Sequence, residues 1–448
     1  MSKVSNSLLA IVFISGSLRA QVPVIEKKDN RLKKINEAIR ARWKDEVSTS
    51  KDFPFSYITA FAQDPHMFYW DTYFINKGLI ATGNLQLAKQ NTLNLLSVVS
   101  RYGFMGNAAV TTWGMNRSQP PYLSVMVRDI YEAEKSKKNL RNVYHLLKQE
   151  YDFWTDTTAT AIENHKTDIP GLQRYYHHAS TSELISLYDE IADRLGLQKN
   201  LPDEQKSKIA SDYAAEAETG MDFTSRFENK CSQFVALDLN CLLYLMEKNL
   251  DWMRGTLKLN NEPKWSEFAQ KRANLINRYC WDEKTGMYYD YNFVEGRRSR
   301  IAAVTTFQPL WAGIASAQQA RRVSENLAAF ATPYGLKTTI KDKDGENYQW
   351  GSNSVWAPMQ LIAAEGLKRY GYVEKANEIA LNFLGLVAKN YSAPLSSNTT
   401  QQPKRSPGLI YEKYKANGTI NDDETAARPM MGWTAGVYAY LYQMLNRP

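Results

Sequence analysis

The chain has 448 residues, of which 44% are hydrophobic and 23% are charged; this is ordinary globular composition and excludes wholesale disorder. The net charge of +8 is scattered, without a lysine or arginine block interleaved with aromatic residues, so no nucleic-acid partner is expected. Three cysteines and five histidines show no metal-ligand spacing, so we expect neither a disulfide framework nor a metal, and no cofactor.

The first twenty residues have the pattern of a secretory signal peptide. Lys3 supplies a positive charge, residues 8–18 are mainly apolar, and Ala20–Gln21 offers a cleavage point. The alternative is a buried N-terminal helix, because the apolar run is too short to span a bilayer. We therefore expect a mature domain of residues 21–448 that is periplasmic or secreted, is not inserted in a membrane, and is monomeric.

Helical periodicity dominates the rest of the chain. Apolar stripes predict helices over 84–101, 122–135, 140–154, 239–253, 268–279, 321–331, 356–370, 376–387 and 437–445. Sustained β alternation is not found. Many helices without a short sequence repeat predict an all-α fold, a single-domain (α/α)6 helical toroid of about twelve helices. Loops at one end of such a barrel would carry the functional residues.

Aromatic and amide residues gather in motifs between these helices. Trp70 and Asp71 lie in Phe-Tyr-Trp-Asp-Thr-Tyr-Phe at 68–74, and Arg117, Ser118 and Gln119 lie in Arg-Ser-Gln-Pro-Pro. Arginine and glutamine offer several donors to adjacent hydroxyl groups, which suits a polyol ligand. The alternative is that they are held in hydrogen bonds at helix ends.

Asp222, in Thr-Gly-Met-Asp-Phe-Thr-Ser-Arg, is a candidate general acid. Apolar Met221 and Phe223 would desolvate its carboxyl group and raise its pKa, as a general acid requires. Gly220 would let the backbone approach a ligand closely. The alternative is that Asp222 caps a helix or pairs with Arg226.

Glu412, in Tyr-Glu-Lys-Tyr, is a candidate general base. Lys413 beside it favours the ionised carboxylate that a base needs. The alternative is a surface ion pair between these two residues, which would contribute little. Glu424 lies nine residues before Trp433 of Gly-Trp-Thr-Ala-Gly and is the other candidate base. Glycoside cleavage without a metal needs two carboxyl groups in such different roles.

Together these motifs resemble the trehalase family of glycoside hydrolases over roughly residues 55–445. A Ser-Gly-Trp-Asp-Phe-Ser-Ser-Arg-Trp segment carries the family's catalytic acid, and Asp222 stands in its place. A Glu-Lys-Tyr segment carries the base, which corresponds to Glu412. The resemblance further implies sugar contacts by Trp70, Asp71, Asn107, Arg117, Ser118, Gln119, Gly220, Arg226, Trp350, Glu424 and Trp433.

The resemblance implies an inverting α-glycosidase that hydrolyses α,α-trehalose, with its two carboxyl groups about 6.5–9.5 Å apart. The chain departs from the family at Gln63, where an arginine is usual, at Met221, which replaces tryptophan, and in its Arg-Pro-Glu segment, for which only Glu183 is a loose counterpart. The glycine run before Glu424 is also lost. Two alternatives therefore stay open: a hydrolase of another α-glucoside or mannoside, and a secreted sugar-binding toroid without catalysis.

Overall fold

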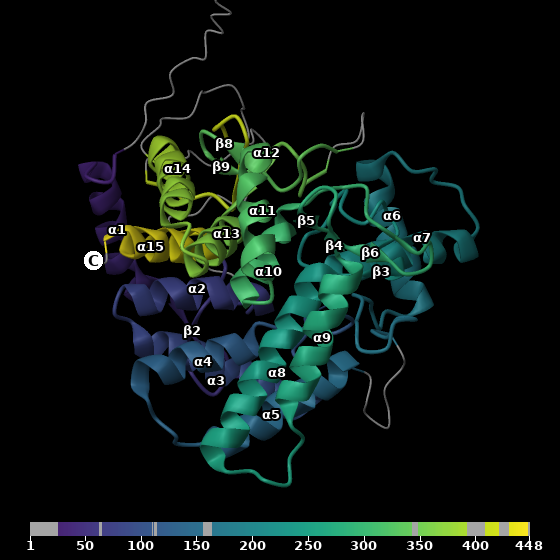
Figure 1. The fold of residues 1–448 in the computed structure, drawn as a ribbon, viewed down its shortest axis with the longest axis horizontal. Coiled ribbons are helices and arrows are strands. Elements are labelled where there is room, and N and C mark those ends of the chain that lie inside the picture. The colour runs from purple at the N-terminus through teal and green to yellow at the C-terminus, as the bar shows by residue number, and fades with distance from the viewer. Residues whose placement is uncertain are drawn as a thin grey trace, which may run out of the picture.

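Contacts between helices arrange most of them in an inner and an outer ring, and Figure 1 labels the helices of both rings. The computed structural model describes residues 26–61, 65–109, 111, 114–155, 164–342, 348–391, 408–420 and 430–446. Each inner helix contacts the next, and the last contacts the first, so the ring closes. The inner helices are α2 (Tyr69–Ala81), α4 (Leu123–Glu134), α8 (Leu237–Leu257), α10 (Gln308–Ala312), α13 (Ala357–Arg369) and α15 (Gly432–Asn446).

The outer ring supplies the second helix of each pair. It comprises α1 (Asn30–Arg42), α3 (Leu85–Tyr102), α5 (Leu140–Thr155), α9 (Trp265–Tyr279), α11 (Ala317–Glu325) and α14 (Val373–Tyr391). These twelve helices of the described residues, six in a closed inner ring and six outside it, confirm the predicted all-α (α/α)6 toroid. Among the described residues, no helix is both long and apolar enough to cross a bilayer.

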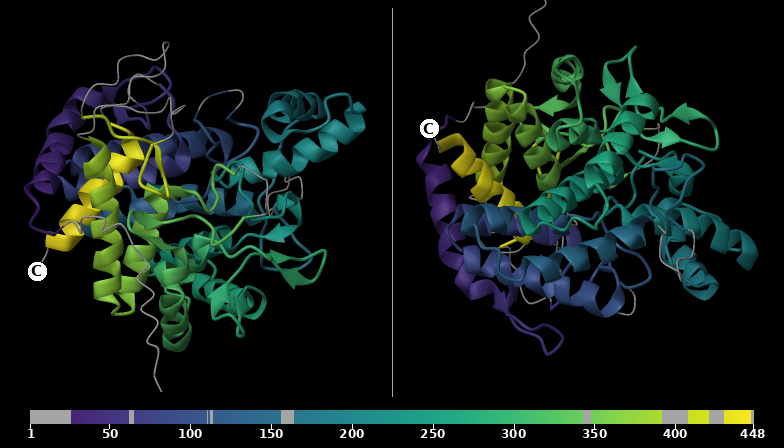
Figure 2. Two further views of the ribbon diagram at one scale, coloured as in Figure 1. Left: turned by 90° about the horizontal axis from the view of Figure 1, so that it is seen from above. Right: turned by 60° about the horizontal axis from the view of Figure 1, so that its bottom comes forward.

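A helical hairpin stands apart from the rings. It consists of α6 (Thr181–Leu195) and α7 (Asp203–Glu218), which pack on each other around a small core that includes Leu184, Tyr188 and Ala210. Figure 2, left, shows this teal hairpin projecting from the body of the molecule. The last turn of α7 leads directly back into the barrel at the segment that carries Asp222.

Short strands and single helical turns fill the connections between helices. The strands are β1 (Val47–Ser48), β2 (Tyr57–Ile58), β3 (Phe234–Val235), β4 (Trp281–Asp282), β5 (Met287–Tyr288), β6 (Tyr291–Asn292), β7 (Arg297–Arg298), β8 (Ala331–Thr332), β9 (Gly335–Leu336), β10 (Ser354–Trp356) and β11 (Lys413–Lys415). The remaining turns are the 3-10 helices 43–46, 231–233 and 304–307 and the α-helix α12 (Leu327–Phe330). The pairings between these strands are antiparallel, and β10 pairs with β11 so that Val355 faces Tyr414.

The closest helix contact of the inner ring joins α2 and α15. A Cβ atom added at Gly78 would lie 2.3 Å from the Cα of Gly436, and one added at Gly436 would lie 2.2 Å from the carbonyl oxygen of Phe74. Real side chains do not approach so closely, so both positions require glycine. Without these side chains, the backbones of α2 and α15 can touch.

Helices α2, α13 and α15 run in the same direction. Trp70 and Trp433, in their first turns, lie 5.6 Å apart between ring centroids. Two turns further along, Lys77 of α2 pairs with Glu365 of α13 at 3.1 Å, and Tyr440 of α15 also bonds to Glu365. The motifs that precede these helices therefore meet at one end of the barrel.

The predicted helices are confirmed at eight of the nine positions named from the sequence, within a few residues at each end. The ninth, 321–331, is divided at Asn326 into α11 and α12, because Asn326 ends α11 and starts the next turn. The sequence analysis missed α1, α2, α6, α7 and α10. The cysteines are buried free thiols at 231, 241 and 280.

Candidate active site

Three carboxyl groups from distant parts of the chain interact at the open end of the barrel. Asp71, in the first turn of α2, is only 6% exposed. Burial raises the pKa of Asp71 to about 8, and the negative charges of Glu412 and then Asp222 add to this shift. Charges influence a buried group in this way only at short range. The fold therefore brings 71, 222 and 412 into one electrostatic environment.

Hydrogen bonds, mainly from side chains, hold the loop that carries Asp222. The carboxyl group of Glu216, in α7, accepts the N–H of Thr224 at 3.0 Å. Thr224 Oγ1 donates to the carbonyl of Trp350 at 3.1 Å, and the N–H of Trp350 donates to the carbonyl of Phe223 at 3.2 Å. Phe223 has a φ of +60°, which is costly for a side chain of this size. The surrounding contacts therefore impose a backbone shape at the residue next to Asp222.

Arg226 lies beneath this loop and is 0% exposed. Its guanidinium donates to Asp290 through Nε at 2.6 Å and through Nη2 at 2.7 Å, and to Asp238 through Nη2 at 2.5 Å. Together the two carboxylates engage every nitrogen of the group, since Nη1 also donates to Asp238. A fully buried guanidinium offers no surface to a sugar. The structure therefore favours an anchoring role for Arg226 over the predicted sugar contact.

Glu412 is held through its backbone, directly before β11. Its carbonyl oxygen accepts the indole N–H of Trp433 at 3.0 Å, while its side chain keeps 20% exposure. The ammonium of Lys413 lies 3.9 Å from Glu412 Oε2 and 5.3 Å above the ring of Trp356. This ammonium favours the charged form of the carboxylate.

Tryptophan rings connect the three segments. Trp70 contacts Trp350 at 5.7 Å and Trp433 at 5.6 Å between centroids, and Trp350 stacks on Trp356 at 3.7 Å. Gly220 belongs to the same contact, because a Cβ atom there would lie 2.6 Å from Cε2 of Trp70. The backbone of Gly220 thus lies close to a tryptophan, and this contact explains its glycine without a ligand.

The Arg-Ser-Gln motif lies directly before α4. Gln119 Oε1 accepts the N–H of Trp70 at 3.2 Å, so Gln119 binds the first turn of α2. The buried hydroxyl of Ser118 donates to the carbonyl of Met105 at 2.6 Å. The backbone carbonyl of Asn107 accepts the N–H of Tyr69 at 3.1 Å, and the backbone N–H of Asn107 donates to the carbonyl of Arg117. These bonds match the helix-end alternative for Ser118 and, in part, for Gln119.

Arg117 differs from its neighbours in this motif. Its Nη1 donates to Asn116 Oδ1 at 2.9 Å, whereas its Nε is buried and has no partner within the described part of the chain. A buried donor without a partner is costly, so a ligand hydroxyl there would be stabilised. Arg117 is therefore the member of the motif best suited to hold a ligand.

Glu424 and Gln63 lie outside the described residues. Glu216, Glu218 and Asp342 were not predicted from the sequence. The carboxyl group of each accepts a hydrogen bond from a loop of the site. The only signal for the glutamates was two acidic residues in the alanine-rich end of α7, directly before the Asp222 motif. No set of three or more metal-ligating side chains converges in the described part of the chain.

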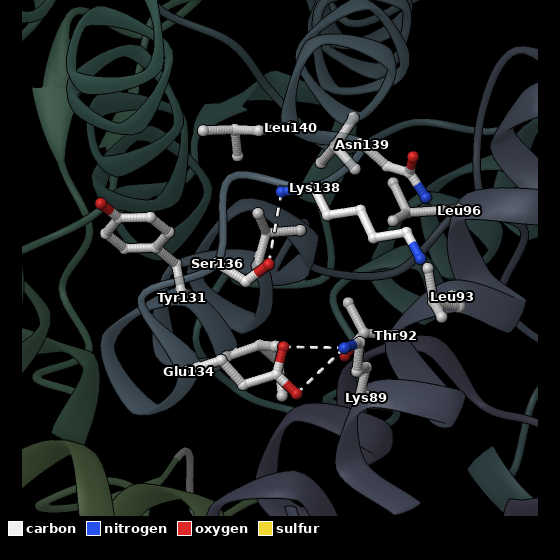
Figure 3. Close-up of a pocket in the computed structure, with 13 residues that line it drawn as sticks. Lys89, Thr92, Leu93, Leu96, Tyr131, Glu134, Ser136, Lys138, Asn139 and Leu140 are labelled. Carbon is white, nitrogen blue, oxygen red and sulfur yellow. Dashed lines mark hydrogen bonds and ion pairs between the residues drawn. The ribbon is translucent and has the colours of Figure 1, made fainter. Parts of the chain in front are cut away.

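A separate cavity of about 270 Å³ opens between α3, α4 and α5 (Figure 3). Apolar side chains such as Leu96 and Val127 line it, and the ammonium of Lys89 pairs with Glu134 at 2.7 Å on one side. No predicted site residue lines this cavity. It is therefore distinct from the environment shared by the three carboxyl groups.

The sequence model of the trehalase family matches residues 6–446, nearly the whole chain. The chain belongs to the trehalase family. It is 26% identical over 451 residues to the cytosolic neutral trehalase of Neurospora crassa, with 84% of this chain and 56% of that protein covered. The chain thus spans little more than half the length of this trehalase-family relative.

Solved structures of related enzymes share the fold. Neutral trehalase Nth1 from Saccharomyces cerevisiae has a TM-score of 0.70 at 22% identity, covering 92% of this chain and 80% of that one. The mannosylglycerate hydrolase of family GH63 from Thermus thermophilus, in complex with glucose, has a TM-score of 0.59 at 15% identity, covering 91% and 98%. At such identities the likeness shows the toroid shared with trehalases.

The predicted periplasmic or secreted location is wrong. The matched Neurospora protein is a cytosolic neutral trehalase, which contradicts a periplasmic or secreted location. The prediction depended on a lysine followed by a short apolar run, and a buried helix can have the same composition. Residues 1–20 lie outside the described part of the chain.

Proposed function

We propose that the protein hydrolyses α,α-trehalose to two glucose molecules with inversion at one anomeric carbon. Asp222 protonates the glycosidic oxygen, and Glu412 removes a proton from the water that attacks the opposite face of the ring. Inversion requires these carboxyl groups to stand about 6.5–9.5 Å apart, so that the water fits between them. Asp71 and Arg117 hold sugar hydroxyl groups, and Trp70, Trp350 and Trp433 form the wall around them.

The observation that carries this proposal is that the segments of Asp71, Asp222 and Glu412 meet at Trp70. Gly220 packs against the ring of Trp70, and Trp433, whose indole N–H binds the carbonyl of Glu412, lies 5.6 Å from that ring. The charges of Glu412 and Asp222 both add to the raised pKa of Asp71. The two candidate residues are 190 positions apart in sequence. A reaction that needs one protonated and one ionised carboxyl group can use them only if they share a site. Membership of the trehalase family supports trehalose as the substrate. The predicted monomeric state and the absence of a nucleic-acid partner stay predictions.

Product analysis by proton NMR tests the proposal. The purified chain is mixed with trehalose, and the anomeric signals are followed before mutarotation. Inversion at one carbon of an α,α-linked disaccharide releases α-glucose and β-glucose in equal amounts. Release of α-glucose alone would show retention and contradict the assigned roles, and no glucose at high protein concentration would contradict the activity.

Substitution of each carboxyl group tests the assignment of roles. We expect Asp222→Asn and Glu412→Gln each to lower kcat by about 10²–10⁴-fold, because each removes one proton-transfer group. Melting temperatures should stay near that of the wild type. Glu190→Gln, at an exposed position on α6, serves as the control. Near-normal turnover by Asp222→Asn would show that another group is the acid.

A second candidate is hydrolysis of a different α-glycoside. The structural likeness to a mannosylglycerate hydrolase and the loss of the family's Arg-Pro-Glu segment favour it. A panel of α-glucosides and α-mannosides, assayed beside trehalose, separates the candidates through kcat/KM. A higher value for another glycoside, with trehalose inert, would replace the first proposal.

A further inference from the structure

One carboxylate at the end of α7 connects three segments around the site. Glu218 is 0% exposed, and its Oε1 accepts the N–H of Ser118 at 2.8 Å. Its Oε2 accepts the N–H of Tyr176 at 2.8 Å and lies 3.1 Å from Nε2 of His165. A single buried side chain therefore connects the Arg-Ser-Gln loop and the 165–176 segment to α7 itself.

Only an ionised carboxylate fits this arrangement. Burial alone would raise the pKa of Glu218, but His165 and the N–H groups of Tyr176 and Ser118 hold it below its usual value. Each oxygen faces a backbone donor. A glutamine at position 218 has only one acceptor oxygen. Its NH₂ group would therefore face one of the two backbone N–H donors, Ser118 or Tyr176.

The segments connected by Glu218 carry different parts of the site. Ser118 lies between Arg117, whose buried Nε has no partner among the described residues, and Gln119, which binds the first turn of α2. Glu218 itself lies four residues before Asp222 on a continuous stretch of chain. A displacement of Ser118 would therefore move Arg117 relative to the general acid.

We propose that Glu218 is a positioning residue that fixes the sugar-holding loop 116–119 against the segment bearing Asp222. This inference rests on the proposed function, because that function gives Arg117 its sugar. Glu216, two residues earlier on α7, bonds to the loop of Asp222 instead, through Thr224. The last turn of α7 thus supports the sugar-holding loop through one glutamate and the acid loop through the other.

The test measures Glu218→Gln against the exposed control Glu190→Gln. We expect KM for trehalose to rise about tenfold while kcat falls less than about threefold, because the sugar-holding loop moves and the acid loop stays bound to Glu216. Hydrogen exchange of peptides that contain Ser118 and Tyr176 should speed up at least tenfold, while peptides from α13 and α15 keep the wild-type rate.

A second variant, Glu218→Asp, controls for misfolding of Glu218→Gln. Glu218→Asp keeps the charge beside His165 but is one methylene shorter, so it should reach the donors less well and give a smaller rise in KM. Wild-type KM and wild-type exchange at Ser118 in both variants would overturn the inference. So would a lower melting temperature without any change in KM, since that would mark a purely structural residue.

The same experiment separates this inference from the proposed function. If the wild-type chain cleaves trehalose and the Glu218 variants match it, only the positioning role fails. If the wild-type chain leaves trehalose intact, the proposed function fails, and the exchange rates at Ser118 and Tyr176 still decide whether Glu218 holds the loop.

Discussion

The segments that carry Asp222 and Glu412 are held in place by different forces. Charged side chains fix the Asp222 loop: the buried Arg226 between Asp238 and Asp290, and the half-buried Asp342, which accepts the hydroxyl of Ser225 at 2.6 Å. Glu412 instead lies beside a strand that pairs with β10, and its carbonyl is bound by Trp433. Side chains therefore position the acid, whereas backbone pairing and helix contact position the base.

This difference has an energetic consequence. A buried ion pair contributes little net stability but is costly to break, because the remaining charge stays buried without its partner. Backbone pairing tolerates changes of side chain, since the bonding groups belong to every residue. Single substitutions should therefore disrupt the acid side more easily than the base side.

The largest expected effect comes from Arg226→Met. The substitution leaves Asp238 and Asp290 buried and without their cation, so the free energy of unfolding should fall by about 3–5 kcal/mol. Urea denaturation followed by tryptophan fluorescence measures the loss. Arg297→Met is the matched control, because Arg297 also pairs with two carboxylates, Glu228 and Glu295, but keeps 27% side-chain exposure.

We expect the control to lose less than about 1 kcal/mol, as exposed pairs do. Equal losses for Arg226→Met and Arg297→Met would mean that burial does not set the cost. The acid side would then not depend on its buried charges, and the comparison with the base side would be wrong.

The segment that carries Glu412 should be displaced when the contact between α2 and α15 is opened. Gly436→Ala places a methyl group 2.2 Å from the carbonyl oxygen of Phe74, so the helices must separate. We expect a loss of about 1–3 kcal/mol, typical of overpacking, and a fall in kcat because Trp433 binds the backbone of Glu412. Thermal denaturation and trehalose kinetics measure the two effects.

Gly255→Ala in α8 is the control for this substitution. No atom lies within 4 Å of a Cβ at Gly255, so alanine should stabilise the helix by roughly 0.5–1 kcal/mol. If Gly436→Ala also stabilised the protein, the close approach of α2 and α15 would not exist.

The sequence predicted several helices that have one apolar face, although α1 and α6, which also have one, were missed. Helix α3 and helix α5 were found from their stripes, since one side of each faces solvent. Helix α2 was missed because it is buried on nearly all sides, so its apolar residues follow no helical period. The same burial makes α2 central to the site, because its first turn holds Trp70 and Asp71.

The sequence named Asp222 and Glu412 as candidates for the acid and the base but not the side chains that hold their segments. Asp222 and Glu412 stand in motifs that resemble those of the trehalase family, so they could be named individually. The partner of Ser118 could not be named, because Glu218 is 100 residues away and accepts a backbone N–H that any residue there would offer. Arg226 shows the converse, since its motif predicted a ligand contact and its buried partners at 238 and 290 became visible only in the fold.

The buried carboxyl group of Glu216, which binds the Asp222 loop, makes the stability of the protein depend on pH. Burial raises the pKa of Glu216 to about 8, with the charge of Asp222 adding to the shift and the N–H groups of Thr224 and Phe223 opposing it. The folded chain thus keeps a proton that the unfolded chain releases near pH 4.5. Because of Glu216, the free energy of unfolding should fall by up to about 1.4 kcal/mol per pH unit as pH rises from about 4.5 to about 8.

Glu216→Gln removes this proton exchange. The unfolding free energy of the variant, relative to the wild type, should therefore increase between pH 5.5 and pH 7.5 in urea denaturation. Glu190→Gln corrects for the effect of substitution at an exposed site. A difference that stays constant with pH would show that Glu216 is already ionised in the folded protein.

The smallest effect is expected for Lys413→Met on the base side. Lys413 lies 3.9 Å from Glu412, at the limit of an ion pair, and both side chains are about one-fifth exposed, so the pair should contribute less than about 1 kcal/mol. Methionine removes the ammonium that lies over the ring of Trp356, whereas the pairing of β10 with β11 is unchanged because it uses backbone groups. Urea denaturation should show a change within about 0.5 kcal/mol. A loss as large as that of Arg226→Met would mean that side-chain charge also positions the base, and the contrast between the two halves of the site would disappear.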